Sequence, residues 1–312
     1  MTALGVLIRV AARRVALLVA LLAVVFVAVD LLPGDAARAA LGRDATQAQL
    51  AAARHELGLD RALPLQFAHW ISGVLTGDFG TTARGRPIGA LLADAVPPTL
   101  LLGGIALALT VVGSLALGVW WTVRPDALGA RLLQPVTVVG VAIPEFVVGT
   151  LLILVFSLAT GLLPAVTVTG RDGWPAGPEM LVLPVLALAI PQIGWNTRIV
   201  RSALADVARL PHVEAAVLDG LPPRIVVLRH MFPFALPTVL AGYATSVGML
   251  LGGALVVETL FNYPGVGALL AGSVADRDTS LVAAVVAVTG VVIMGLLVIA
   301  DATRAWAMRE LR

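Results

Sequence analysis

The stretch Glu214-Ala-Ala-Val-Leu-Asp-Gly220 lies in the one long polar gap between apolar segments in the second half of the chain. Arginines stand on both sides of it, so the segment is poorly suited to crossing a lipid bilayer. Its helix-forming run ends at Gly220, and Pro222 and Pro223 then begin a new turn. Such a segment is suited to the cytoplasmic face of a membrane, where another protein can push on it.

The composition is that of a polytopic membrane protein. Of the 312 residues, 59% are apolar and 13% are charged, and the mean hydropathy is +0.97. Soluble domains average about 45–50% apolar and about 25% charged residues. The absence of cysteine excludes disulfides and thiolate metal sites. All 21 basic residues are arginines spread between the apolar segments, which differs from the basic stripe of a nucleic-acid-binding surface.

Apolar stretches of about twenty residues predict an all-α fold with six transmembrane helices in a lipid bilayer. The first stretch is interpreted as a retained helix, because its apolar core exceeds that of a signal peptide and no small-residue cleavage site precedes Pro33. The predicted spans are residues 10–32, 98–123, 132–158, 181–200, 235–257 and 280–300.

The arginine distribution predicts that both termini are cytoplasmic. In that orientation 13 of the 21 arginines lie in cytoplasmic segments, and the short outer loops hold only Arg171 and Arg277. The other arginines lie in one long outer segment, where the positive-inside rule has little force. We therefore divide the chain into an N-terminus with the first helix (1–32), an extracytoplasmic insertion (33–95) and a five-helix core (96–312) with a cytoplasmic loop at 201–232.

The extracytoplasmic insertion is predicted to be small and helical. One helix is expected to begin after Thr46 and to end at Gly58, and a second to cover residues 65–75. A segment of this size buries little core by itself, so it should pack on the outer ends of the spans as a lid or docking surface.

Six short motifs follow one another along most of the chain. Together with the Glu-Ala-Ala segment, their order resembles that of one group of permeases. The group is the first permease subunit of ATP-binding-cassette (ABC) importers for dipeptides, oligopeptides and nickel, which has the type I importer permease fold. The motifs are LLPGD at 31–35, HELGLDR at 55–61, GDFGT at 77–81, LLPA at 162–165, VETLFNYPGVG at 257–267 and RD at 277–278.

The resemblance implies a multi-subunit transporter in the bacterial inner membrane. Its expected partners are a second homologous permease, two cytoplasmic ABC ATPase subunits and an external solute-binding protein that delivers the substrate. Short peptides are the expected substrate class, and nickel or a metal chelate is the alternative. The chain has no lysine and therefore no Walker A motif, so ATP and Mg²⁺ are expected on the partner subunits, and the chain itself is a transport subunit without a cofactor.

In this family the Glu-Ala-Ala segment is a short helix that docks into a groove on the ATPase. Glu214 can cap backbone amides or meet an arginine across the interface, whereas Ala215 and Ala216 permit close approach. Gly220 permits the sharp turn, and Arg224 follows it as a further coupling residue. The alternative is an ordinary solvated loop with a chance pair of alanines.

The segment departs from the family pattern at two places. His212 stands where the peptide group has tyrosine. Pro233 and Phe234 replace an arginine–asparagine pair that commonly follows the next basic residues.

Three polar residues are candidates for the translocation path or gate. Glu145 follows Pro144 inside the third predicted span, so it either faces the cavity and attracts a cationic substrate or reaches water near a span end. Glu258 ends the fifth span and is either a gate residue or the acceptor that holds the turn at Asn262.

Two other classes of protein are weighed against an importer. An intramembrane enzyme needs a catalytic constellation, and a secondary transporter favours internal repeats with several buried ionisable groups. Neither pattern is present, and the four scattered histidines lack the spacing of a metal site.

Overall fold

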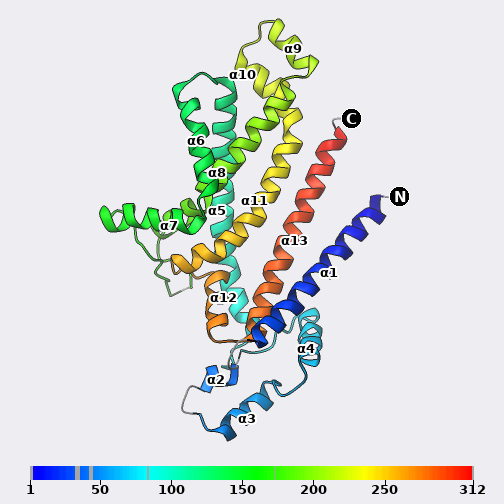
Figure 1. Cartoon of the computed structure of the whole chain (residues 1–312), viewed down its shortest axis with the longest axis vertical. Helices are drawn as coiled ribbons and strands as arrows, with labels where there is room; N and C mark the ends of the chain where they lie inside the picture. Colours follow the sequence, from blue (N-terminus) through cyan, green and yellow to red (C-terminus); the bar gives the residue numbers. More distant parts are fainter. Residues whose placement is uncertain (1–2, 32–35, 42–44, 83, 172, 311–312) are drawn as a thin grey trace. The chain divides into compact units, whose positions relative to one another are not determined.

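The structure is a computed structural model that describes residues 3–31, 36–41, 45–82, 84–171 and 173–310. These residues are mostly helical (Figure 1), as expected. Of the 31–35 motif, residues 32–35 lie outside the described part. The helices, in which η marks a π-helix, are α1 (Ala3–Asp30), α2 (Ala36–Leu41), α3 (Gln47–Glu56), α4 (Leu63–Leu75), α5 (Ile88–Val123), α6 (Leu128–Ala142), α7 (Glu145–Leu152), η1 (Ile153–Ala159), α8 (Glu179–Val207), α9 (Pro211–Leu218), α10 (Pro223–Ile225), η2 (Val226–Met231), α11 (Phe232–Leu260), α12 (Val266–Ala275) and α13 (Thr279–Glu310).

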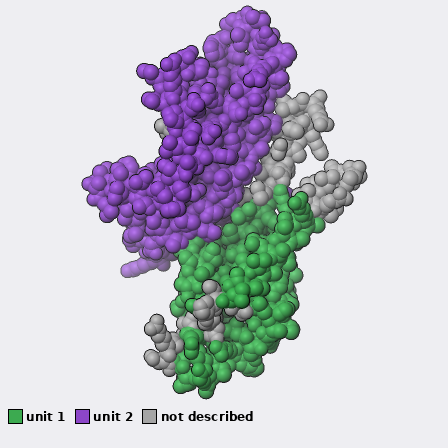
Figure 2. Space-filling model, viewed as in Figure 1, with its two compact units in different colours: residues 1–98, 264–294 green, residues 99–263, 295–312 purple. Residues whose placement is uncertain are grey.

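The chain divides into two compact units, shown in separate colours in Figure 2. Unit 1 consists of Met1–Pro98 and Pro264–Met294, and unit 2 of Thr99–Tyr263 and Gly295–Arg312. The helices α5 and α13 contribute residues to both units. With 36 residues, α5 is about 54 Å long, which exceeds the ~30 Å of a hydrocarbon core. It begins ten residues before the predicted span.

Unit 1 contains the predicted helices of the insertion. The Thr46 hydroxyl accepts the Gln49 amide at 3.3 Å, and the Gln49 side chain accepts the Thr46 amide at 2.8 Å. This capping box starts α3, and Gly58 follows the helix with φ +67°. Helix α4 packs on α1 through aromatic rings, because Phe26 lies 5.5 Å from Phe67 and 5.8 Å from Trp70 between centroids.

Unit 2 is built around α8 and α11, which pack along one another. Apolar side chains from both helices form its buried core, with α5 and α7 against them. Two polar contacts cross this core: the Asn196 amide nitrogen donates to the Ser246 hydroxyl at 2.6 Å, and the Ser114 and Tyr243 hydroxyls are 2.8 Å apart. In a low-dielectric interior such bonds fix the register of the helices.

Four helices of the described residues have the length and apolar composition of a membrane span, and a fifth is present if one bent pair is a single span. The four cover Ala12–Val29, Ile88–Val123, Glu179–Val207 and Pro223–Leu260. The sixth predicted range falls on α13, whose described apolar part is the shorter stretch Thr279–Gly295.

The third predicted span is not one straight helix. It breaks between Ala142 and Glu145, and the two parts, Leu128–Ala142 and Glu145–Ala159, are bent by 108°. Pro144 has no amide hydrogen and disfavours helical geometry at Ile143, which adopts an extended conformation with ψ 122°. Glu145 is therefore the first residue of a new helix rather than a mid-span residue.

Candidate functional site

The Glu-Ala-Ala segment forms the short helix α9, which lies with α10 at one end of unit 2 (Figure 1). Leu210 is extended, and Pro211 is at the first helical position, where its missing amide hydrogen costs nothing. After Asp219 the chain reverses at Gly220, whose φ is +74°. The helix thus ends before Gly220, as the sequence predicts.

The two sides of α9 have different surroundings. Val213 is 2% exposed and Ala216 is 4% exposed, because both pack into the core cluster formed with α8 and η2. Glu214 and Ala215 are exposed, and Leu218 is 80% exposed. Of the alanine pair, only Ala215 is therefore on the outward surface; Ala216 joins the helix to its own unit.

His212 connects α9 to the chain beyond the turn. Its Nε2 lies 3.0 Å from the carbonyl oxygen of His230, and its ring lies 4.4 Å from that of Phe234 between centroids. Arg224 lies in α10 and is exposed. The structure thus brings Glu214, Ala215 and Arg224 to one exposed end of unit 2, and Gly220 to the turn between them.

Glu145, the first of the three candidates for the translocation path or gate, lies at the start of α7. Its side chain is half-buried and packs against Gly253 of α11, where an added Cβ would lie 3.2 Å from the Glu145 carboxyl carbon. The absence of a side chain at Gly253 thus makes room for the carboxylate. A helix N-terminus also stabilises negative charge.

Glu258 is fully buried, with 0% of its surface exposed, near the end of α11. Its Oε1 accepts a hydrogen bond of 2.6 Å from the hydroxyl of Thr99, and its carbonyl oxygen accepts the Tyr263 amide at 2.8 Å. Burial raises the pKa of the Tyr263 hydroxyl, and the negative charge of Glu258 raises it further. This carboxylate is built into the packing of unit 2.

Asn262 lies in the turn after α11 and is exposed. Its φ is +50°, in the left-handed region that asparagine tolerates better than most residues. Glu258 and Asn262 therefore belong to one turn.

Sequence reasoning missed the polar pairs in the core of unit 2. Asn196 and Ser246 are fifty residues apart in the sequence, so their hydrogen bond becomes visible only in the folded chain. The available signal was the occurrence of amide and hydroxyl side chains within apolar spans, which predicts an internal partner but does not say which one.

Two family models match the chain over most of its length. Residues 114–312 match "Binding-protein-dependent transport system inner membrane component", and residues 3–87 match the N-terminal part of such membrane components.

Curated relatives match over most of both chains. A glutathione transport system permease protein, GsiC, of Pectobacterium atrosepticum is 37% identical over 86% of this chain and 85% of its own. GsiC of Salmonella typhimurium is 38% identical over 83% of each. A probable peptide ABC transporter permease, y4tP, of Sinorhizobium fredii is 32% identical over 92% of each.

A solved structure has the same fold. An inward-facing MetNI methionine ABC transporter chain aligns with a TM-score of 0.56 and 16% identity, over 70% of this chain and 96% of its own. With the two family models and the curated relatives, it confirms the type I permease fold. The chain belongs to the family of binding-protein-dependent transport system inner membrane components, and it is a permease subunit of an ABC importer rather than an enzyme.

Proposed function

We propose that this permease takes up short peptides that an external solute-binding protein delivers. Two relatives that cover most of the chain are named for glutathione, which is a tripeptide, and for peptides. Nickel or a metal chelate, the alternative predicted from the sequence, has no comparable support. The proposed complex contains a second homologous permease and two ABC ATPase subunits, which bind ATP and Mg²⁺.

The two-sided surroundings of α9 carry the coupling proposal. Its outer side, with Glu214, Ala215 and the exposed Leu218, docks into a groove on the ATPase. Its inner side, Val213 and Ala216, packs against α8 and η2, so a displacement of α9 moves these helices with it. Arg224 adds a cation at the edge of the docking surface, and Gly220 sets the direction of the chain beyond it.

The proposal places residues 33–95 outside the cell and residues 201–232 inside, with both termini cytoplasmic. Because the chain has no cysteine, single introduced cysteines report topology directly. A cysteine at the exposed Ala52 is expected to react with an impermeant thiol reagent in intact cells, whereas one at the exposed Leu218 reacts only after the membrane is opened. The reverse pattern contradicts this topology.

Uptake in a strain that carries the complete transporter tests the substrate class. Labelled di- and tripeptides should accumulate only when the ATPases are active, and nickel should not. Accumulation of nickel without peptides would instead support the metal alternative. If ATPase subunits do not co-purify with the permease, the coupling proposal is contradicted.

A further inference from the structure

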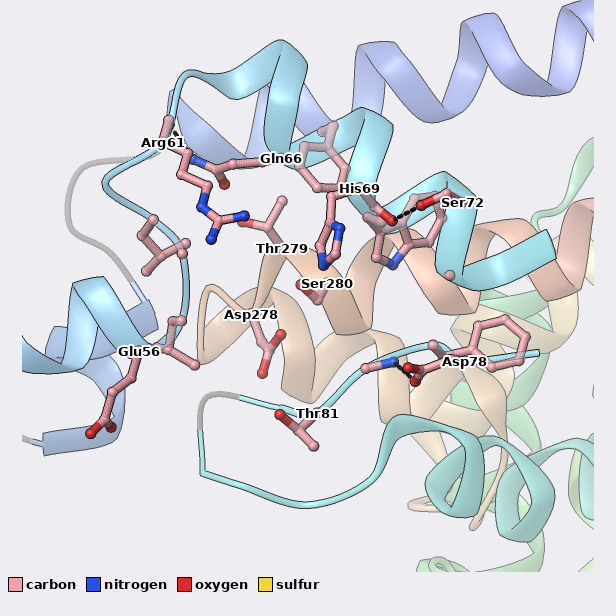
Figure 3. Close-up of a pocket in the computed structure, with 18 of the residues that line it drawn as sticks. Glu56, Arg61, Gln66, His69, Ser72, Asp78, Thr81, Asp278, Thr279 and Ser280 are labelled. Carbon is pink, nitrogen blue, oxygen red and sulfur yellow. Dashed lines mark hydrogen bonds between the residues drawn. The ribbon is translucent and has the colours of Figure 1, made fainter. Parts of the chain in front are cut away.

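Unit 1 contains a cavity of about 550 Å³. Its lining comes from the turn after α3, from α4, from residues 78–81 and from the turn between α12 and α13 (Figure 3). Cavities that bind small ligands usually have volumes of about 300–1,000 Å³. The size and the four-sided lining therefore suit a small molecule.

Groups of opposite charge face this cavity. Arg61 and His69 reach into it from the side of α4, together with the amide of Gln66 (Figure 3). Asp78 and Asp278 lie across from them. The carboxylate of Glu56, by contrast, points away from the cavity in the same view.

The acidic side is held in place by backbone amides. Oδ1 of Asp78 accepts the Gly80 amide at 2.9 Å, and Oδ1 of Asp278 accepts the Leu281 amide at 3.0 Å in the first turn of α13. These bonds orient both carboxylates before any ligand arrives. Preorganised groups bind more tightly because less side-chain entropy is lost on binding.

The basic side is braced in a similar way. The Gln66 side chain donates a hydrogen bond of 2.9 Å to the carbonyl oxygen of Arg61. In Asp60, the residue before Arg61, a carboxylate oxygen lies 2.7 Å from Nδ1 of His55, and this hydrogen bond lowers the pKa of Asp60. The loop that presents Arg61 is thus tied to both α3 and α4.

One wall also contains a buried donor. Trp70 lines the cavity and is 8% exposed, and its indole nitrogen has no hydrogen-bond partner within the part of the chain that the structure describes. Its ring packs against Phe26 and Phe67, which fix its position. A buried polar group without a partner is rare in proteins, and a ligand in the cavity is a natural acceptor.

We infer that this cavity binds a small zwitterion, a free α-amino acid or a short peptide, through both of its charges. The carboxylate lies towards Arg61 and Gln66, and the ammonium group lies towards Asp78 and Asp278. Arginine matches a carboxylate in charge and in geometry, and aspartate matches an ammonium group. The inference rests on the proposed function, which places this part of the chain outside the cell. The cavity then gives the permease an external substrate site of its own.

The inference is tested by measuring ligand binding to the assembled transporter in the absence of its solute-binding protein and of nucleotide. The probes are alanyl-alanine, the same dipeptide with an acetylated amino group, and the same dipeptide with an amidated carboxyl group. Isothermal titration calorimetry gives the dissociation constant of each. Alanyl-alanine should bind, and blocking either end should weaken it by about tenfold or more, because each block removes a charged hydrogen-bonding group.

Variants assign each end of the peptide to its side of the cavity. Arg61→Gln should weaken alanyl-alanine by about tenfold but leave the amidated dipeptide nearly unchanged. Asp78→Asn keeps an acceptor for the Gly80 amide and should weaken alanyl-alanine but not its acetylated form. Glu56→Gln, whose carboxylate points away, is the matched control and should bind as the parent does.

Four results overturn the inference: no binding of alanyl-alanine at millimolar concentration, equal binding of the blocked dipeptides, binding that is indifferent to Arg61→Gln and Asp78→Asn, or binding of phosphoethanolamine in place of the dipeptide. The last result assigns the cavity to a lipid headgroup. Each is distinct from failure of the proposed function, because ATP-dependent peptide uptake with the solute-binding protein present is measured separately.

Discussion

The rings of His212 and Phe234 are in contact, with centroids 4.4 Å apart and planes inclined by 39°. They occupy the two places where the coupling segment departs from the family pattern. His212 lies in the first turn of α9 and Phe234 in the first turn of α11, so the contact connects the coupling helix to a long helix of unit 2. The two departures are therefore one structural feature.

Loss of the ring at His212 should weaken the coupling of ATP hydrolysis to transport. His212→Ala removes both the ring contact and the bond to the His230 carbonyl, whereas His212→Tyr, the residue typical of the peptide group, keeps an aromatic ring. We expect fewer peptides transported per ATP hydrolysed in the first variant and a near-normal ratio in the second. A double-mutant cycle of thermal stability with Phe234→Leu should give a coupling energy of about 0.5–1.5 kcal/mol. Additive effects of the two substitutions would contradict the contact.

A β-branched residue at Gly220 should uncouple transport. The φ of +74° is strained for L-residues, and no atom lies within 4 Å of an added Cβ, so the strain comes from the backbone alone. Gly220→Val should cost about 1–2 kcal/mol and misdirect the turn. Gly220→Asn is the matched control, since asparagine tolerates this conformation. ATPase co-purification and peptide uptake are measured for both variants. If Gly220→Val performs as well as Gly220→Asn in both, the backbone turn at Gly220 is not needed for coupling.

Glu258 should matter for stability more than for transport. Thr99→Val removes the hydrogen bond that the Thr99 hydroxyl donates to this buried carboxylate and should destabilise the protein by about 1–3 kcal/mol. Glu258→Gln keeps an acceptor for Thr99 and removes the charge, so it should fold and transport. Thermal stability and uptake are measured on each variant. If Glu258→Gln stays folded but loses uptake, Glu258 is a gate residue instead.

Glu145 should influence cationic substrates if it faces the translocation cavity. Glu145→Gln removes the charge but retains the size that fills the space beside Gly253. Uptake of a cationic peptide should fall several-fold, since one charge contributes about 0–1 kcal/mol at an exposed site and more where water is limited. Uptake of a neutral peptide and basal ATP hydrolysis should persist. Equal uptake of both peptides assigns Glu145 to a water-reaching helix start.

The sequence by itself determined most of the helices and the C-terminal end of α9. Apolar length identified four of the spans, Thr46 and Gly58 delimited α3, and Gly220 ended α9. These signals are local, because capping, proline and left-handed backbone geometry depend on a few neighbouring residues. The order of short motifs also identified the family.

Only the tertiary structure decided which side chains meet. The Thr99–Glu258 bond joins residues 159 positions apart, and the burial of Ala216 beside the exposed Ala215 depends on how α9 packs against α8. The 108° bend at Pro144 likewise turned an apparent span into two helices. Apolar length and local signals specify where a helix can form, but partners across a core are chosen by the packing of whole helices.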